Sequence, residues 1–178
     1  MRVVAGEFGG RRLVGPDGTT TRPTTDRVRE AIFNSLGSAG LLEGALVADL
    51  FAGSGALGIE ALSRGAERCV FVERDRTALR ALDANLEALG LAARSSVITS
   101  DVMAVVGSID ADIVFADPPY DFDEWQRLLD GVRADLVVAE SGRPVGDVAG
   151  REPVRSKKYG RTTVTTLERV TAPERPPE

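Results

Sequence analysis

The chain has 178 residues, of which 43% are hydrophobic and 28% are charged, and it contains no histidine and a single cysteine, Cys69. This composition excludes disulfides, cysteine-rich zinc sites, iron–sulfur clusters bound within one chain, and every catalytic site that depends on histidine. The net charge of −5 argues at first sight against a nucleic-acid partner, because a polyanion attracts a basic surface.

The first residues are not typical of a signal peptide, and no apolar stretch approaches the roughly 18 residues that a membrane span requires. We therefore expect a soluble cytoplasmic protein with no membrane contact. Cys69 lies in an apolar run and is expected to be a small buried residue, not a reactive thiol. No long heptad pattern indicates an oligomer, so we expect a monomer.

The charge is distributed unevenly along the chain. Residues 1–30 carry six arginines against four acidic residues, and residues 151–178 carry seven basic residues against four acidic ones. The middle of the chain carries nine basic and nineteen acidic residues. The acidity therefore belongs to the central segment, and the two basic ends are the parts expected to meet any nucleic acid.

The sequence begins with short apolar runs separated by glycines. This pattern predicts a β-hairpin in which Gly9 and Gly10 supply the positive φ of the turn. From Thr25 the apolar residues follow helical spacing, which predicts a helix that Thr24 or Thr25 caps and Gly37 ends.

Short apolar runs then alternate with helical patterns, which is typical of βαβ units and a parallel sheet covered on both faces. The expected fold class is doubly wound α/β. The predicted strands are Ala45–Leu50, Cys69–Glu73, Ser96–Thr99, Ile113–Ala116 and Leu136–Ala139, and the predicted helices are Ala56–Arg64, Thr77–Leu89, a short turn at Met103–Val106, and Asp123–Val132, which would bury Trp125.

The end of the chain has a different pattern. Residues Pro153–Gly160 and Thr162–Val170 read as two strands with no helix between them, and so short a connection makes them antiparallel. We thus divide the chain into an N-terminal β-hairpin extension at 1–20, one domain at 21–171 and a proline-rich tail at 172–178 that we expect to be disordered.

A glycine motif, Gly53-x-Gly55-x-x-Gly58, follows the first predicted strand and opens a helix. Such a turn lets the backbone approach a ligand closely and can point amide groups at it. Glu73 follows twenty residues after Gly53, at the end of the next strand, where a carboxylate can accept both hydroxyls of a ribose. Asp49 either contacts the ligand or holds the amides of the loop. The spacing favours a nucleoside cofactor.

The sequence Asp117-Pro118-Pro119-Tyr120 follows the fourth strand, at the edge of the sheet where doubly wound folds bind ligands. The Asp117 carboxylate and the Pro118 carbonyl can accept the two N–H bonds of an exocyclic amine and so make its nitrogen more nucleophilic. Two prolines stiffen the loop, and Tyr120 offers a ring on which a base can stack. This motif favours amine methylation over dinucleotide chemistry.

Taken together, these motifs resemble a known family, the RsmD family of bacterial methyltransferases that modify guanine N2 in small-subunit ribosomal RNA. The similarity runs over nearly the whole chain. The segments that carry it are Arg22-Pro23-Thr24-x-Asp26-Arg27-Val28-Arg29-Glu30, Asp49-Leu50-Phe51-Ala52-Gly53-Ser54-Gly55-Ala56-Leu57-Gly58, Glu60-Ala61-Leu62-Ser63-Arg64-Gly65-Ala66, Val72-Glu73, Asp117-Pro118-Pro119-Tyr120 and Lys158-Tyr159-Gly160.

The resemblance implies a class I Rossmann-like methyltransferase fold with S-adenosylmethionine as cofactor and no metal. It implies that Asp117, Pro118, Pro119 and Tyr120 form the catalytic loop that holds the target base. From the residues alone, Asp101 is as readily a helix cap as a ligand; by the resemblance it reaches the adenine amino group. The residues expected to line the cofactor site are Asp49, Phe51, Ala52, Gly53, Gly55, Glu73, Arg74, Asp101, Val102 and Asp117.

The resemblance also implies a substrate: guanine 966 of 16S ribosomal RNA, in the assembled or assembling 30S subunit. For Arg22 and Arg27, contact with a phosphate or the cofactor carboxylate competes with plain surface charge. Basic residues near both ends of the chain are candidate RNA contacts, against the alternative of an ordinary solvated face. The expected RNA-binding residues are Arg11, Arg12, Arg22, Arg27, Lys157, Lys158, Tyr159 and Arg161.

Three other functions fit the same motifs. The first is another amino-methyltransferase, acting on adenine N6 in DNA or RNA or on a protein glutamine, although the glutamine enzymes favour asparagine at the first position of the Asp-Pro-Pro-Tyr motif. The second is a catalytically silent RNA-binding assembly factor, against which the intact Asp117 and Glu73 speak. The third is a nicotinamide dehydrogenase, since its glycine motif is similar.

Overall fold

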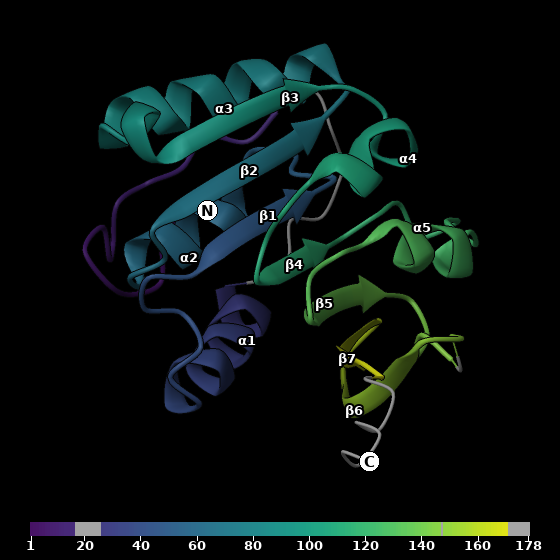
Figure 1. Ribbon diagram of the computed structural model, residues 1–178. Coiled ribbons are helices and arrows are strands. Elements are labelled where there is room, and N and C mark those ends of the chain that lie inside the picture. Colours follow the sequence, from purple (N-terminus) through teal and green to yellow (C-terminus); the bar gives the residue numbers. More distant parts are fainter. Residues whose placement is uncertain (17–25, 147, 171–178) are drawn as a thin grey trace, which may run out of the picture.

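The computed structural model describes residues 1–16, 26–146 and 148–170. Figure 1 shows a twisted sheet with helices on both of its faces. None of the helices in these described ranges has the length and apolar character needed to cross a membrane. The elements in chain order are α1 (Asp26–Ser38), β1 (Leu46–Leu50), α2 (Ala56–Ser63), β2 (Arg68–Glu73), α3 (Arg76–Leu89), the 3-10 turn η1 (Ala92–Arg94), β3 (Ser95–Thr99), α4 (Val102–Val105), the 3-10 turn η2 (Val106–Ser108), β4 (Ile113–Ala116), α5 (Trp125–Gly131), β5 (Leu136–Ser141), β6 (Arg151–Tyr159) and β7 (Thr162–Arg169).

The sheet has seven strands in the order β3-β2-β1-β4-β5-β7-β6. Neighbours from β3 to β5 are parallel, whereas β7 is antiparallel to both β5 and β6. The doubly wound α/β class and the antiparallel C-terminal hairpin are therefore confirmed. Because Ser141 at the end of β5 pairs with Thr163 at the start of β7, the β6–β7 turn lies at the edge where the parallel strands end.

Side chains alternate along the strands and build one apolar core on each face of the sheet. On one face, α1, α2 and α3 pack over Phe33, Phe71 and Phe115, and the rings of Phe33 and Phe115 lie 5.1 Å apart. On the other face, α4 and α5 cover a second cluster that includes Leu50 and Leu128. Helix α1 lies on the first face, where Phe33 packs on Phe115 of β4.

Two helix boundaries differ from the prediction by two residues or more. Gly37 lies inside α1, and the chain leaves the helix at Gly40, which adopts the left-handed φ of +68°. Helix α5 begins at Trp125 and not at Asp123, and the Trp125 ring is half-buried, edge-on to Phe122 at 5.3 Å, so it is not a core residue. The predicted caps at residues 24 and 25 and the predicted disordered tail lie outside the described residues.

The first residues form a narrow antiparallel arch, as the hairpin prediction expects. The amide of Val3 donates to the Arg11 carbonyl at 3.0 Å, and the amide of Gly10 donates to the Val3 carbonyl at 2.9 Å. The turn is wider than the predicted Gly-Gly pair: Gly6 and Gly10 adopt a φ of +82°, whereas Gly9, for which a positive φ was predicted, does not. A Cβ at Gly6 would stand 1.9 Å from the Ser63 carbonyl oxygen, so this arch lies directly against α2.

A fully buried carboxylate, Glu60 of α2, fastens this arch to the domain. Its oxygens accept the amides of Val4 and Ala5 at 2.7 and 3.1 Å, and Oε1 also accepts Arg64 Nε at 2.7 Å. Burying a charge without partners is costly, and these three donors supply the required partners. The N-terminal segment is therefore part of the core packing and not a loose appendage.

Glu60→Ala tests this contact. The substitution leaves two backbone amides and Arg64 without their acceptor, and breaking a buried charged contact costs roughly 3–5 kcal/mol. We expect the free energy of unfolding, measured by urea titration, to fall by about that amount. Glu87→Ala, at an exposed position of α3, is the matched control and should leave it unchanged. A loss below about 1 kcal/mol for Glu60→Ala would contradict the fastening role of Glu60.

Candidate functional site

The carboxyl ends of β1, β2, β3 and β4 bring the predicted site residues to one edge of the sheet. Asp49 pairs in register with Phe71 of β2 and Phe115 of β4, and Glu73 ends β2. The Asp117–Tyr120 loop follows β4 immediately. Parallel strands end at the same edge, so these segments, far apart in sequence, surround one place.

The glycine loop between β1 and α2 contains three residues with unusual backbone geometry, and Gly58 in the first turn of α2 has unusually close packing. Phe51, Gly53 and Gly55 adopt left-handed φ values of +63°, +57° and +83°. A Cβ at Gly58 would stand 2.3 Å from the buried ring of Phe71, so that glycine permits α2 to pack on β2. At Gly53 a Cβ would meet no described atom within 4 Å, which leaves this face of the loop open to a ligand.

The amides of the three motif glycines donate within the protein, contrary to our expectation that the loop points free amides at a ligand. Gly53 N donates to Glu73 Oε2 at 2.8 Å, Gly55 N to the Ala52 carbonyl at 2.7 Å, and Gly58 N to Asp49 Oδ2 at 2.8 Å. An anionic pyrophosphate would need such amides free. This arrangement instead suits a ligand that carries no phosphate at the loop.

Asp49 is 1% exposed and lies below the glycine loop. Burial raises the pKa of Asp49 well above its ordinary value, and the charges of Asp117 and Glu73 raise it further, while the hydrogen bond from Gly58 opposes the shift. The sequence left two roles open for Asp49: contact with the ligand, or holding the amides of the loop. The structure shows a hydrogen bond of the second kind, because Asp49 accepts the Gly58 amide. Its negative charge, with those of its neighbours, also favours a cationic ligand above it.

Glu73 is held by three backbone amides. Beyond the Gly53 contact, its Oε1 accepts the amides of Arg74 and Asp75, both at 2.8 Å. The carboxylate is half-buried and fixed in orientation before any ligand arrives. It joins the end of β2 to the glycine loop, a structural role that the sequence pattern did not indicate.

Arg74 and Asp101 form an exposed ion pair at 2.6 Å, between the ends of β2 and β3. Asp101 also caps α4 by accepting the Met103 amide at 2.9 Å, which is the alternative role that the sequence suggested. The side chain of Val102 is buried in the core, so only its backbone can face a ligand. Ala52 is likewise buried, and its amide donates to the Val72 carbonyl at 3.0 Å.

The Asp117–Tyr120 loop exposes an aromatic ring at the same edge. Asp117 is half-buried, Pro118 is buried, and Tyr120 is 63% exposed. The Tyr120 hydroxyl lies 3.2 Å from Thr162 Oγ1, and a Cβ at Gly142 would stand 3.3 Å from the ring. The end of β5 and the start of β7 thus support the ring from one side and leave most of it open for stacking.

A second aromatic group lies beside the loop. The Phe122 ring is edge-on to that of Phe51 at 5.5 Å and to that of Trp125 at 5.3 Å. The Phe122 amide donates to the Pro119 carbonyl at 2.9 Å and closes the turn at the end of the Asp117–Tyr120 loop. Phe51, expected at the cofactor site, therefore joins the glycine loop to the loop that follows β4.

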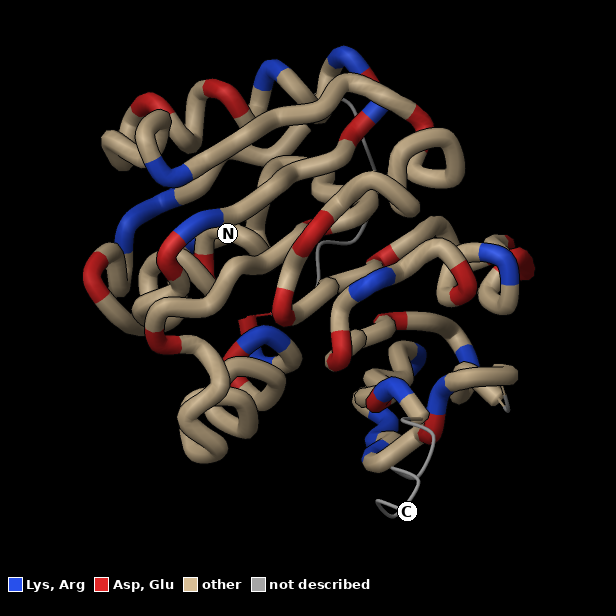
Figure 2. Tube along the Cα trace, viewed as in Figure 1, with Lys and Arg blue, Asp and Glu red and all other residues tan. Residues whose placement is uncertain are grey.

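The predicted RNA-binding residues do not form one cluster. Arg11 donates to the Ala88 carbonyl near the end of α3, at the sheet edge away from the site, whereas Arg161 lies in the β6–β7 turn at the site edge. Arg12 and Arg27 are exposed, and Arg22 lies outside the described residues. Figure 2 shows basic residues along the C-terminal hairpin, so this hairpin is the basic surface beside the site.

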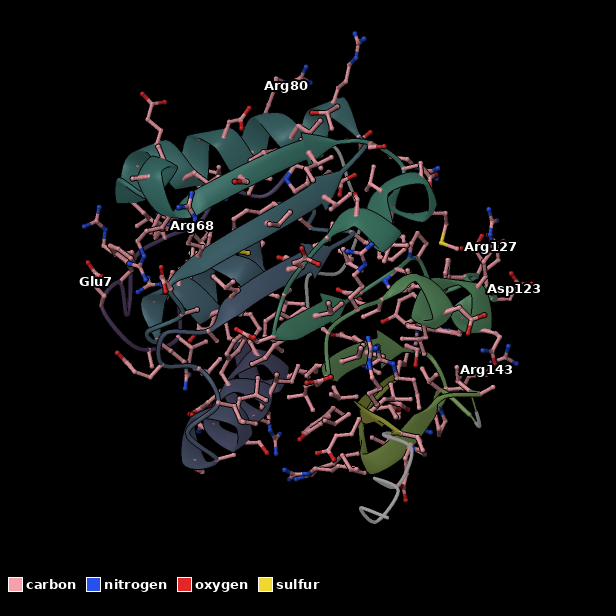
Figure 3. All side chains as sticks on the ribbon, viewed as in Figure 1. Glu7, Arg68, Arg80, Asp123, Arg127 and Arg143 are labelled. Carbon is pink, nitrogen blue, oxygen red and sulfur yellow. The ribbon has the colours of Figure 1, made fainter. Side chains whose placement is uncertain are left out.

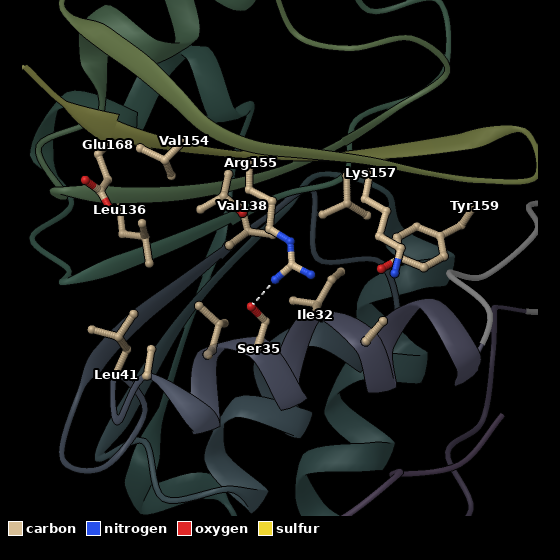
Figure 4. A pocket seen from close by; sticks show the side chains of 15 residues that line it. Ile32, Ser35, Leu41, Leu136, Val138, Val154, Arg155, Lys157, Tyr159 and Glu168 are labelled. Atoms are coloured by element: carbon tan, nitrogen blue, oxygen red, sulfur yellow. Dashed lines mark hydrogen bonds between the residues drawn. The ribbon is translucent and has the colours of Figure 1, made fainter.

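A groove of about 160 Å³ separates α1 from the C-terminal hairpin, and Figure 4 shows its lining. Arg155 crosses it to donate to Ser35 Oγ at 2.5 Å. Lys157 and Tyr159 both line the groove, and the Lys157 ammonium lies 5.2 Å from the centre of the Tyr159 ring. Tyr159 is therefore half-buried by packing, while Lys158 on the same strand is exposed.

Comparison with known proteins agrees with this geometry. The family model described as Conserved hypothetical protein 95 matches residues 1–168. The Bacillus subtilis protein YlbH, whose name describes it provisionally as an rRNA methyltransferase, is 38% identical over 95% of this chain and 99% of its own length.

The chain belongs to the RsmD family of methyltransferases.

Other similar proteins agree with this assignment. Ribosomal RNA small subunit methyltransferase D of Escherichia coli is 43% identical over 67% of this chain and 60% of its own length. The solved structure of the Escherichia coli protein yhhF is 35% identical and superimposes with a TM-score of 0.82, covering 95% of this chain and 97% of that one. The class I Rossmann-like fold is thereby confirmed.

S-adenosylmethionine is the cofactor that this RsmD-family assignment implies, and the residues present fit it. Its sulfonium is a cation, which the buried Asp49 and the half-buried Glu73 and Asp117 favour electrostatically. It carries no phosphate, in agreement with loop amides that already donate to Glu73 and Asp49. The open face at Gly53 leaves room for the cofactor to approach the loop backbone.

Asp49 predicts a pH dependence of stability. Because its pKa is raised in the folded protein, the folded state keeps the proton to a higher pH than the unfolded chain does. Its contribution to stability is therefore present below the unfolded pKa, about 4, and is lost as the pH rises through the raised folded pKa. Asp49→Asn keeps an oxygen for the Gly58 amide but cannot titrate.

We expect the free energy of unfolding to decline more steeply with rising pH in the wild type than in Asp49→Asn, when both are measured by urea titration from about pH 5 to about pH 8. Asp83→Asn, an exposed acid on α3, serves as control and should keep the wild-type slope. Parallel curves for wild type and Asp49→Asn would mean that Asp49 does not titrate in this range.

Proposed function

We propose that this protein transfers a methyl group from S-adenosylmethionine to the exocyclic N2 of guanine 966 in bacterial 16S ribosomal RNA. The proposed substrate is the assembled or assembling 30S subunit in the cytoplasm, and the proposed enzyme is a monomer. Membership of the RsmD family and the names of its relatives support a small-subunit ribosomal RNA as substrate. The observation that carries the proposal is the Asp117–Tyr120 loop at the carboxyl edge of the sheet, with its exposed ring.

When bound, S-adenosylmethionine supplies an electrophilic methyl group. In this proposal the Glu73 carboxylate holds the ribose, Asp101 accepts from the adenine amino group, and the glycine loop lets the cofactor approach its backbone. Glu73 and Asp101 are oriented beforehand by hydrogen bonds to backbone amides, so little ordering remains to be done on binding. Arg74, through its ion pair with Asp101, is a positioning residue.

The chain's own groups act on the amine in this proposal. The Asp117 carboxylate and the Pro118 carbonyl accept the two N–H bonds of N2, which turns the nitrogen lone pair toward the methyl group. Tyr120 stacks on the base once the base leaves its RNA stack, and its contact with Thr162 holds the ring in place. Asp117 then relays the proton that the new secondary amine must release. No covalent intermediate with the protein is needed.

Asp117→Ala tests the proposal. We expect the rate of methyl transfer to fall by about 100-fold or more, because an acceptor aimed at the amine is lost, while cofactor affinity changes little. The measurement uses tritiated S-adenosylmethionine and small subunits from cells that lack the gene, followed by digestion to nucleosides and mass spectrometry. Asp121→Ala, an exposed acid next to the loop, is the matched control and should stay active.

The nucleoside product separates the alternatives. N2-methylguanosine supports the proposal, whereas N6-methyladenosine would assign the adenine chemistry. No methyl transfer by the wild type to any RNA or DNA substrate would favour a silent binding factor. Near-normal transfer by Asp117→Ala would exclude Asp117 as the acceptor that activates the amine.

The basic hairpin predicts how RNA binding depends on salt. If exposed Lys158 and Arg161 each contact a phosphate, replacing both with alanine should reduce the slope of log affinity against log salt by about 2. Arg68→Ala is the matched control, since Arg68 begins β2 at the opposite edge of the sheet (Figure 3) and should leave the slope unchanged. The measurement is binding to purified small subunits over a series of salt concentrations. An unchanged slope in the double variant would exclude these phosphate contacts.

A further inference from the structure

Glu140, in β5, is a buried carboxylate at the site that the sequence motifs did not single out. It is 6% exposed. Ala139 of β5 pairs in register with Ala116 of β4, so Glu140 and Asp117 are the next residues along two adjacent parallel strands. Adjacent strands lie roughly 4.8 Å apart, which sets the two carboxylate-bearing residues side by side at the end of the sheet.

The alternation of side chains places both residues on the face that α1 covers. Val138 and Phe115, which precede Glu140 and Asp117 by two positions, both belong to the core on that face. The charge of Asp117 acts on the pKa of Asp49, whose register partners Phe71 and Phe115 also belong to that core. Asp117 and Glu140 are therefore acceptors on the same side of the same sheet edge.

The end of β5 also forms the wall behind the catalytic loop. Gly142, two residues after Glu140, comes so close to Tyr120 that a Cβ there would stand 3.3 Å from the ring. Thr162 of β7 holds the Tyr120 hydroxyl at 3.2 Å from the same side. A base that stacks on Tyr120 and presents an amine to Asp117 therefore turns the edge that carries this amine toward the end of β5.

We propose that Glu140 is a specificity-determining residue that accepts the N1–H of the target guanine. This inference rests on the proposed function, because it identifies the base that the Asp117–Tyr120 loop receives. Guanine carries N1–H directly beside its N2 amine, so a second acceptor next to Asp117 meets a second donor. A carboxylate has about four lone-pair sites, so Glu140 can keep the interaction it already makes within the protein and accept one more.

The same carboxylate acts against adenine. Beside its exocyclic amine, adenine presents the N1 lone pair, which is an acceptor and would face the negative charge of Glu140 without a proton between them. With adenine, the buried carboxylate of Glu140 faces the N1 lone pair, so the site rejects this base. With guanine, the same carboxylate accepts N1–H, so the site accepts the base. Asp117 and Pro118 alone would accept an amine from either base.

The test compares two bases that share the 2-amine but differ at N1 and at C6, where 2,6-diaminopurine has an amine in place of the guanine carbonyl. Small-subunit particles are reconstituted with guanosine or with 2,6-diaminopurine riboside at the target position. 2,6-Diaminopurine keeps the 2-amine but has an N1 acceptor in place of N1–H. We expect the wild type to prefer guanine by about 10-fold to 100-fold in kcat/KM. Glu140→Gln keeps an oxygen that can accept N1–H and gains an amide that can donate to the N1 acceptor, so it should reduce or abolish that preference.

The controls separate selectivity from folding and from the proposed function. Glu87→Gln on α3 should keep the wild-type preference, and the urea midpoint of Glu140→Gln reports whether it folds. If Glu140→Gln does not fold, a wild type that shows no preference between the two bases still contradicts the inference. An equal loss on both bases by a folded Glu140→Gln, or no preference in the wild type, would overturn the inference. If the wild type methylates no guanine N2 at all, the proposed function itself fails.

Discussion

The hydrogen bond from the Gly58 amide to the buried Asp49 carboxylate is the contact on which the site's geometry depends. It joins the end of the central strand β1 to the start of α2, and so fixes the path of the glycine loop between them. A carboxylate placed there is disfavoured by desolvation and by neighbouring negative charges, and its raised pKa reflects both. The unfavourable free energy of burying this carboxylate arises at a place where a cation and the N–H donors of a base would offset it.

The acidity of the chain has a local explanation. Asp49, Glu73 and Asp101 each accept at least one backbone amide, so these carboxylates shape the loops as well as the electrostatic potential. Basic side chains of the C-terminal hairpin border the site. An acidic pocket for a cationic ligand beside a basic surface for a polyanion is compatible with a net charge of −5.

Local periodicity carried most of the fold prediction: the strand expected at Ile113–Ala116 is the observed β4, and the glycine at position 90 caps α3 as a helix-ending pattern suggests. What failed depended on longer-range geometry. Gly37 and Gly40 are equally good stop signals in sequence, and only packing decides between them. Glu140 lies near the end of a strand as Glu73 does and could have been noticed, but its place beside Asp117 requires the β4–β5 register.

The position of β7 near the end of the chain determines when Tyr120 gains its hydroxyl partner during synthesis. Strand β7 completes the outer side of β5 and supplies Thr162, the partner of Tyr120, from 42 residues further along the chain. A nascent chain that has emerged only through β5 contains the glycine loop, Glu73 and Asp117 but lacks Thr162, the partner of the Tyr120 hydroxyl. The support of the Tyr120 ring is therefore completed only after the start of β7 has been synthesised.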